Sequence, residues 1–286
     1  MALDEKGYSL EEPTLIKTEV KIGLAKPLRV LQISDTHLAL VNENDNERKH
    51  ALAARRQFGL PEETLALVSE YSKREGLTIL HTGDLIDFVS DANLKRAKEF
   101  LDANDCFVAA GNHEFSQYVG EAFEDEAYRN QSLPLVQKYF NNDIRFSVRE
   151  IGGVNFVAID NSYYKIDRTQ LDGLKQVVKM GKPVVLLMHT PLYTKGLFDL
   201  MRSRSTKYPV YLMSTPHELM DYYSEKEYGQ QVSDAVTDEA YEYIMGERAI
   251  KCILAGHLHF CYEDGVGGDL PQYITGLNVI REVLFT

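Results

Sequence analysis

Five short apolar stretches of the sequence each end in side chains that can bind a metal or move a proton, and this recurrence limits the possible folds. The stretch 77–87, LTILHTGDLID, shows the arrangement most clearly. Its first four residues predict a buried strand, and Gly83 follows where glycine permits close backbone approach. Ligands of α/β proteins bind at the carboxyl ends of strands. We therefore expect Asp84 and Asp87 at such an edge, although this stretch alone is equally compatible with a polar loop.

The four other strand ends carry the same kinds of side chain. They are Asp35 with His37, Asn112 with His113, His189, and His257 with His259. In Asp-x-His and His-x-His, the spacing places both side chains on one side of an extended segment, so two ligands can converge. Imidazole and carboxylate together suit zinc, manganese or iron. An aspartate can bridge two ions, and Asp84, on the strand expected to be central, is the natural candidate.

Each of these strand ends has a simpler interpretation when it is considered alone. Asp35 to His37 could form a turn or a helix cap, Asn112 and Asp87 could hydrogen-bond within loops, and His189 could be a satisfied strand-end histidine. The joint pattern favours a metal centre, because five of the eight histidines fall at strand ends beside suitable oxygen ligands. The remaining three histidines have no such partners and are interpreted as structural: His50, His81 and His217.

The order of the expected elements indicates an α/β protein. Strands are predicted over 16–22, 28–33, 77–80, 106–110, 144–149, 154–159, 183–188, 250–254, 272–275 and 279–284. Helices are predicted over 47–57, 61–74, 91–102, 116–140 with an interruption at Pro134, 167–180 and 233–245. Gly152-Gly153 is a strong hairpin signal. Strands alternate with helices at first and then dominate, which is typical of an α/β sandwich with a mixed sheet.

Composition excludes several classes of protein. A net charge of −12 argues against a broad surface for nucleic acid or anionic lipid. No apolar run approaches the roughly 18 residues that a membrane span needs. The first residues, MALDEKGYSLEEP, carry acids where a signal peptide carries bases, and the three cysteines lack zinc-site spacing. We therefore expect a reduced, cytoplasmic protein without a membrane segment.

Residues 193–246, called the Tyr-rich segment below, fit the alternation poorly. Eight of the seventeen tyrosines lie in this segment. We expect a single domain over 1–286 in which this segment is an insertion or lid. Arg202 and Arg204, with Lys207, are candidate phosphate contacts, although a solvated basic turn is the simpler interpretation. Further candidate substrate contacts follow the strand at 154–159; they are Asn161, Tyr163 and Tyr164.

Taken in order, the motifs resemble those of the calcineurin-like metallophosphoesterase superfamily and extend over residues 35–259. The resemblance implies a four-layer α/β/β/α sandwich of two mixed sheets flanked by helices, with two divalent transition-metal ions (manganese, iron, zinc or similar) between the sheets. It implies these ligands: Asp35, His37, Asp84 and His259 for one ion, and Asp84, Asn112, His189 and His257 for the other. His113 would be the catalytic imidazole, and Asp87 would orient it.

Departures from the family pattern narrow the resemblance. Glu114 stands where the third motif often has aspartate, a change outside the expected ligand set. Phe88-Val89 replaces the Arg-Gly of Ser/Thr protein phosphatases, and Asp87 stands where purple acid phosphatases carry a tyrosine ligand. The stretches SDTHL and MHTPLY are similar to the bacterial branch that contains class III cyclic-nucleotide phosphodiesterases.

The expected reaction is hydrolysis of a small phosphorylated substrate, with a phosphodiester first and a phosphomonoester or nucleotide second. Two cations would share a hydroxide that attacks phosphorus, and His113 would protonate the departing oxygen as general acid. A DNA-repair nuclease shares the motifs, but the acidic charge argues against it. A metal-free binding scaffold would be expected to have lost ligands, whereas every ligand position is filled.

Overall fold

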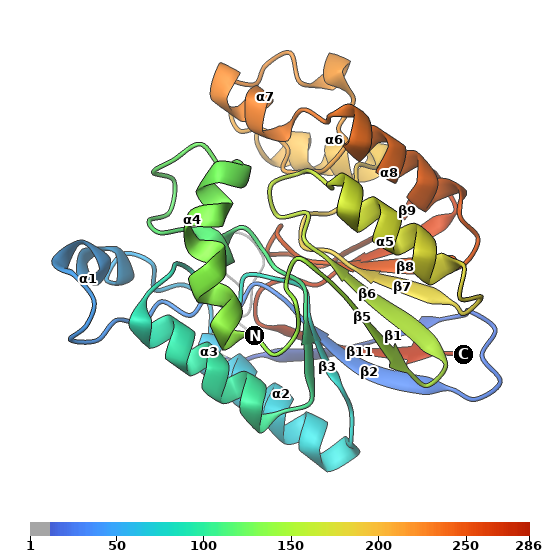
Figure 1. The fold of residues 1–286 in the computed structure, drawn as a ribbon, viewed down its shortest axis with the longest axis horizontal. Helices are drawn as coiled ribbons and strands as arrows, with labels where there is room; N and C mark the ends of the chain where they lie inside the picture. The colour runs from blue at the N-terminus through green and yellow to red at the C-terminus, as the bar shows by residue number, and fades with distance from the viewer. Residues whose placement is uncertain (1–11) are drawn as a thin grey trace.

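The computed structural model describes residues 12–286, and Figure 1 shows two sheets with helices on their outer faces. The interpretation of the amino-terminal residues as unlike a signal peptide falls mainly on residues 1–11, outside the described part. The five-stranded sheet has the order β1 (Thr14–Val20), β11 (Val279–Phe285), β2 (Leu28–Ile33), β3 (Ile79–His81) and β4 (Cys106–Val108). The six-stranded sheet has the order β5 (Phe146–Ile151), β6 (Val154–Ile159), β7 (Val184–Leu187), β8 (Ile250–Ala255), β10 (Leu270–Ile274) and β9 (Tyr262–Val266).

Both sheets are mixed. In the first sheet, β2, β3 and β4 run parallel, β11 is antiparallel to β2, and β1 is parallel to β11. In the second, β6, β7, β8 and β10 run parallel, with antiparallel β5 and β9 at the two edges. The predicted hairpin at Gly152-Gly153 joins β5 to β6, and both glycines have a positive φ.

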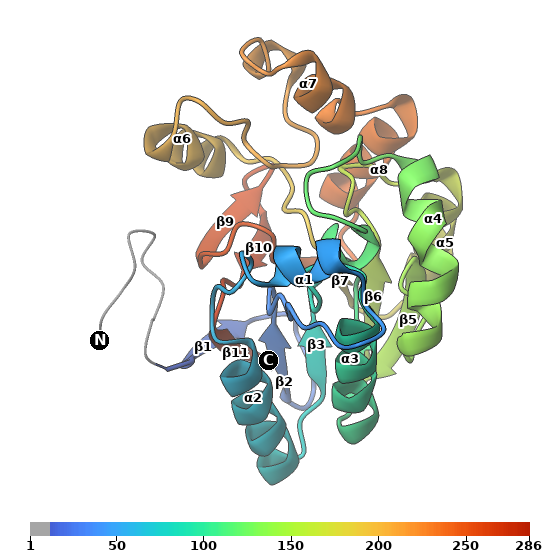
Figure 2. The ribbon, with the colours of Figure 1, turned by 90° about the vertical axis from the view of Figure 1, so that its left-hand side faces the viewer.

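Helices cover the outer face of each sheet (Figure 2). The helices on the five-stranded sheet are α2 (Pro61–Glu75), α3 (Asp91–Ala103) and α4 (Glu126–Val136). The helices on the six-stranded sheet are α5 (Arg168–Val178) and α8 (Ala235–Gly246). The remaining helices are α1 (Glu47–Ala53), α6 (Lys195–Arg204) and α7 (Glu225–Gln231), with short 3-10 turns η1 (His113–Phe115), η2 (Gln137–Tyr139) and η3 (His217–Leu219).

Three apolar layers separate these four layers of secondary structure. The middle layer lies between the sheets and contains Val30, Leu80, Phe156, Leu187 and Phe285, all buried. Each outer layer joins one sheet to its helices. The chain therefore has the predicted α/β/β/α sandwich with two mixed sheets.

Local sequence signals explain most element boundaries. Pro61 occupies the first turn of α2, and Gly76 ends this helix in the left-handed conformation that glycine adopts readily. Two expectations differ from the structure. In the stretch 116–140 only α4 and the 3-10 turn η2 are helical, and Pro134 lies inside the last turn of α4. Strand β9 was not expected, because its sequence YEDGV contains an acid pair and a glycine, which strands disfavour.

The topology brings the carboxyl ends of parallel strands from both sheets to one edge of the sandwich. β2, β3 and β4 end there in one sheet, and β7 and β8 end there in the other. A hydrogen bond from Gln32 Nε2 to the carbonyl of Ala255 (2.9 Å) joins the two sheets near this edge. Within residues 12–286 no helix is long and apolar enough to cross a membrane.

Candidate metal centre

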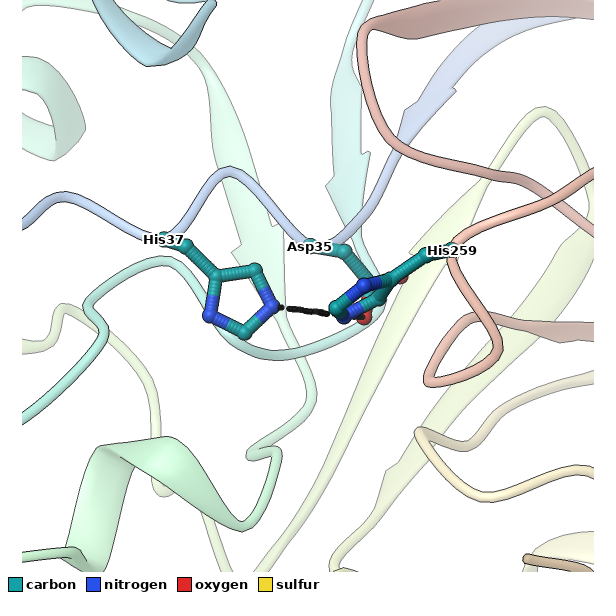
Figure 3. Close-up of side chains that lie close together, drawn as sticks. All are labelled: Asp35, His37 and His259. Atoms are coloured by element: carbon teal, nitrogen blue, oxygen red, sulfur yellow. Dashed lines mark hydrogen bonds and ion pairs between the residues drawn. The ribbon is translucent and has the colours of Figure 1, made fainter. Parts of the chain in front are cut away.

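Asp35, His37 and His259 converge on one point from two sheets (Figure 3). The Nε2 atoms of His37 and His259 are 2.9 Å apart, and Asp35 Oδ1 lies 3.6 Å from His259 Nε2. Asp35 and His37 follow β2, whereas His259 follows β8. A pair of imidazole nitrogens and a carboxylate oxygen in such a group is a donor set for a borderline divalent metal.

A second group lies beside the first and is joined to it by Asp84. Asp84 Oδ2 is 3.1 Å from His189 Nε2 and 3.6 Å from His37 Nε2, so one carboxylate oxygen faces both groups. His257 Nδ1 is 3.1 Å from His189 Nε2 and completes the second group. These residues together with Asn112 are called the strand-end site below; its members are Asp35, His37, Asp84, Asn112, His189, His257 and His259.

The backbone of this site is held in an uncommon conformation. Five members have positive φ angles between 50° and 70°: Asp35, His37, Asp84, His257 and His259. Only eight non-glycine residues of the described chain have a positive φ. Residues with side chains adopt this left-handed region at a cost, and such residues cluster at functional sites. The conformation turns consecutive ligands toward the same point.

Three glycines of the motifs are required because side chains or backbone of neighbouring strand ends approach them closely. A Cβ atom on Gly111 would lie 2.2 Å from Asp84 Oδ1, and one on Gly256 would lie 1.8 Å from Ser34 Oγ. A Cβ atom on Gly83 would lie 2.5 Å from His189 Nδ1, across the two sheets. These distances are far shorter than van der Waals contact, so the strand ends can approach only because these positions lack a side chain.

Outer hydrogen bonds fix the orientation of the imidazoles. His37 Nδ1 donates to Asp87 Oδ1 (2.9 Å), and His189 Nδ1 donates to the carbonyl of Thr82 (2.8 Å). The hydroxyl of Tyr164 lies 3.1 Å from His257 Nε2. In each histidine the other ring nitrogen therefore faces the centre, which is the arrangement of metal-binding histidines in general.

Burial and neighbouring charges hold several of these groups in the deprotonated form that binds a metal. Burial would raise the pKa of Asp84, but the imidazoles of His189 and His113 outweigh burial and hold that pKa well below its usual value. Burial lowers the pKa of His257 and of His259, so both rings are neutral at pH 7. Metal binding requires deprotonated ligands, and these three groups already have that form. In His189 burial would lower the pKa, but Asp84 outweighs burial and raises it to about 9, so this ring would release a proton when an ion binds.

Asp87 is shared among more partners than its sequence suggests. Arg56, which sequence reasoning missed, donates to both carboxylate oxygens at 2.7 Å, and His37 binds the same carboxylate. His113 Nδ1 donates to the backbone carbonyl of Asp87 (2.7 Å) and lies 3.3 Å from its Oδ1. Burial would raise the pKa of Asp87, but Arg56 and the two imidazoles lower it. Because the Arg56 cation already binds this carboxylate, Asp87 serves as an anchor for the two rings rather than as a third ligand group.

Glu114 is a second residue whose role sequence reasoning missed. Its carboxylate is fully buried and accepts the backbone N–H groups of Asp84, Leu85, Ile86 and Gly111 at 2.7–3.2 Å. Burial and the neighbouring Asp84 raise the pKa of Glu114, and its backbone donors oppose this. The side chain thereby joins the turn after β3 to the turn after β4. The only sequence signal for this role is the position of Glu114 at the end of the motif Gly-Asn-His-Glu.

The predicted substrate contacts differ in whether their side chains line a cavity. Asn161 is buried and accepts the backbone N–H of His189 (3.0 Å), so it supports that loop. The Tyr163 hydroxyl is buried and finds no hydrogen-bond partner in the described part of the chain. Arg202 stacks on Tyr222, whereas Arg204 lines a cavity of about 760 Å³ together with His257 and His259. Of these four residues, Arg204 is the one that lines this cavity.

The residues present fit a pair of divalent ions. Asn112 Oδ1 is buried and has no hydrogen-bond partner within residues 12–286, which a polar atom rarely tolerates unless a ligand satisfies it. The six other ligand positions form two groups of three, and the ligand atoms within each group lie within 4.8 Å of one another. The donor set of imidazole nitrogen, carboxylate and amide oxygen matches manganese, iron or zinc. The predicted assignment of four ligands to each ion is compatible with these groups.

A model of a known protein family matches most of the chain. A model described as calcineurin-like phosphoesterase matches residues 28–261. No curated protein matches the chain. Among solved structures, a dimetal phosphatase from Danio rerio has 14% identity, with 87% of each chain covered and a TM-score of 0.48. A putative 5'-nucleotidase from Staphylococcus aureus has 14% identity and a TM-score of 0.47, with 91% of this chain covered but only 51% of that protein. Phosphopantetheinyl hydrolase from Mycobacterium tuberculosis has 10% identity and a TM-score of 0.42, with 91% and 90% covered.

Proposed function

Because the chain belongs to the calcineurin-like phosphoesterase family, we propose that it is a two-metal phosphoesterase that hydrolyses phosphodiesters of small molecules. The observation that carries the proposal is the position of Asp84. Its Oδ2 faces His189 and His37, which belong to the two ligand groups, and its Oδ1 accepts the backbone N–H of His113 (2.9 Å). One carboxylate thereby connects both ligand groups to the candidate general acid.

In this proposal one ion is held by Asp35, His37, Asp84 and His259, and the other by Asp84, Asn112, His189 and His257. Two divalent ions, when bound, supply an activated water nucleophile and neutralise charge on the phosphoryl oxygens. The protein's own part is to fix the ligand atoms and to exclude competing protons. The buried carboxylates and the outer hydrogen bonds of the histidines perform this part.

His113 is placed to protonate the leaving oxygen. Its Nδ1 is engaged with the carbonyl of Asp87, which leaves Nε2 to donate. Burial would lower the pKa of His113, but Asp84 and Asp87 outweigh burial and raise it to about 10. The imidazole therefore carries its proton at neutral pH, as a general acid requires.

The preference for diesters rests on the similarity of SDTHL and MHTPLY to the cyclic-nucleotide branch, and an assay decides it. The protein, reconstituted with manganese, iron or zinc, is offered bis-p-nitrophenyl phosphate, p-nitrophenyl phosphate and a cyclic nucleotide. We expect a higher kcat/KM for the diesters. A higher value for the monoester would assign a phosphomonoesterase, and no turnover with two ions bound would favour a binding scaffold.

His113→Ala tests the general acid. We expect a loss of roughly 10²–10⁴ in kcat for an alkyl ester, whose leaving oxygen needs a proton, and a smaller loss for the p-nitrophenyl ester. Metal content should stay at the wild-type value because the His113 ring is not a proposed ligand. His217→Ala, which removes a histidine outside the strand-end site, is the control. Equal losses for both esters would exclude proton donation by His113.

A further inference from the structure

We propose that the cavity beside His257 and His259 receives one ester group of the substrate and selects a planar aromatic group that carries an anionic substituent. This inference rests on the proposed phosphoester hydrolysis. The cavity has a volume of about 760 Å³ and is formed where residues of the Tyr-rich segment meet the turn after β8. Ligand sites typically have volumes of roughly 300–1,000 Å³, so this space accommodates much more than a small alkoxide.

The lining favours a flat, apolar group. Three aromatic side chains, Tyr208, Tyr211 and Phe260, line the cavity together with the apolar Met201 and Pro209. Among residues 12–286 no aspartate or glutamate lines the cavity, although the chain as a whole carries a net charge of −12. Aromatic faces stack on planar rings, and stacking favours an aromatic group over a saturated ring of similar size.

Arg204 supplies a positive charge that no acid of residues 12–286 neutralises. Its guanidinium lies 4.1 Å from the centroid of the Phe260 ring, and within residues 12–286 no carboxylate forms an ion pair with it. Arg202, two residues earlier, does not line the cavity. Its guanidinium lies 3.7 Å from the centroid of the Tyr222 ring and donates to the carbonyl of Thr206. An unpaired guanidinium beside aromatic rings binds a carboxylate or phosphate on the same ligand that stacks there.

The cavity is continuous with the proposed centre. Its lining includes His257 and His259, one from each ligand group, and the Tyr211 ring lies edge-on to His257 with centroids 5.9 Å apart. A phosphoryl group held at the strand-end site would therefore direct one of its ester substituents into the cavity. This position makes Arg204 and the aromatic side chains specificity-determining residues rather than catalytic ones.

A matched set of methyl phosphodiesters tests the inference on the metal-loaded protein. The second ester group is 4-carboxybenzyl, 4-methylbenzyl or cyclohexylmethyl, so that each leaving group is a primary alcohol. We expect the highest kcat/KM for 4-carboxybenzyl and the lowest for cyclohexylmethyl. Arg204→Gln should reduce the carboxyl-to-methyl preference by roughly 10-fold, because it removes a charge-assisted hydrogen bond. Tyr208→Ala should reduce the aryl-to-cyclohexyl preference by roughly 3- to 10-fold.

Lys195→Gln is the control variant, since it removes the same charge from an exposed position of α6 that does not line the cavity. Its preference ratios should equal those of the wild type. Equal ratios for Arg204→Gln and the wild type would overturn the role of Arg204, and equal kcat/KM values for all three esters would overturn the cavity as a selective subsite.

Calorimetric binding of the product 4-(hydroxymethyl)benzoate separates this inference from the proposed function. We expect binding that weakens by roughly 10-fold in Arg204→Gln. If no ester is hydrolysed but this binding pattern is found, the hydrolytic function fails and the subsite stands. If esters are hydrolysed but the product does not bind, or binds equally to both proteins, the subsite fails and the function stands. Absence of both would overturn both.

Discussion

In the strand-end site most polar groups are buried and held by hydrogen bonds, whereas in the Tyr-rich segment several aromatic side chains are partly exposed. Asp35, His37 and His189 have no solvent exposure, while Tyr208 and Tyr228 are 63% and 38% exposed. The segment still contributes to the core, because Leu212 and Met213 lie in the same apolar cluster as β7 and β8. In the strand-end site the positions of individual atoms are therefore constrained, whereas in the Tyr-rich segment only the volume and polarity of the side chains are. Substitutions should therefore affect the two regions in different ways.

The largest effect is expected at Asp84. Asp84→Asn keeps the shape of the side chain but removes the charge that faces both ligand groups, so affinity for the second ion should fall by more than the roughly 100-fold that loss of an outer partner costs. Metal content measured by emission spectroscopy after gel filtration checks this expectation. Asp102→Asn on the exposed face of α3 should retain both ions. Two tightly held ions in Asp84→Asn would show that Asp84 does not bridge.

Glu114→Gln should have the next largest effect. Glutamine has one acceptor oxygen, so its NH₂ group would face two backbone N–H groups that Glu114 now accepts. We expect a loss of about 1–3 kcal/mol in the free energy of unfolding and a weakening of metal affinity by roughly 10- to 100-fold. Urea unfolding and metal titration measure the two changes. Glu126→Gln at the exposed start of α4 is the control, and wild-type metal affinity in Glu114→Gln would disprove the supporting role.

The same contrast explains what could be predicted from the sequence. The strand ends Asp35-x-His37 and His257-x-His259 were predicted because ligand chemistry demands particular residue types at a fixed spacing. The four-layer sandwich was predicted through the same motifs. Arg56 and Glu114 were missed, since an ion pair across 31 residues and a carboxylate that binds backbone amides leave no repeating pattern.

The Tyr-rich segment could be predicted only at its last helix, α8. Helices α6 and α7 begin at side-chain caps, Thr194 and Ser224, but many sequences satisfy the same packing. Short, partly exposed helices carry weak periodicity, so the pattern of apolar residues did not define their ends. The choice of Arg204 over Arg202 as a cavity residue likewise depends on which side of α6 each occupies, and the helix had not been predicted.

His81 tests whether burial at the strand ends holds a histidine neutral. Burial lowers its pKa to about 3, below the usual value of 6.5. Below pH 6.5 His81 is therefore protonated in the unfolded chain, whereas in the folded chain it stays neutral down to about pH 3. The neutral ring thus contributes its full stabilisation only above pH 6.5. As the pH falls through that window, stability should decrease by about 1.4 kcal/mol per pH unit from this group alone.

Urea unfolding of the chelator-treated wild type and of His81→Asn between pH 7.5 and pH 5 measures this dependence. Asparagine retains an acceptor for the backbone N–H of Gly83, which now donates to His81 Nδ1, but does not titrate. The other histidines contribute equally to both proteins and cancel in the difference. We expect the wild type to lose stability relative to the variant as the pH falls, and a difference that is constant with pH would refute a neutral buried His81.

The smallest effect is expected in the Tyr-rich segment at Tyr223. Its hydroxyl accepts the backbone N–H of Val210 (2.9 Å) and donates to the carbonyl of the same residue (2.8 Å). Tyr223→Phe leaves that buried N–H without this partner, so we expect a loss of about 1 kcal/mol in the free energy of unfolding. Because no ligand atom of the strand-end site moves, kcat and metal content should stay within twofold of the wild type, in contrast to Glu114→Gln. A large loss of kcat in a fully folded Tyr223→Phe protein would mean that the segment helps to fix the centre, and the distinction between the two regions would then fail.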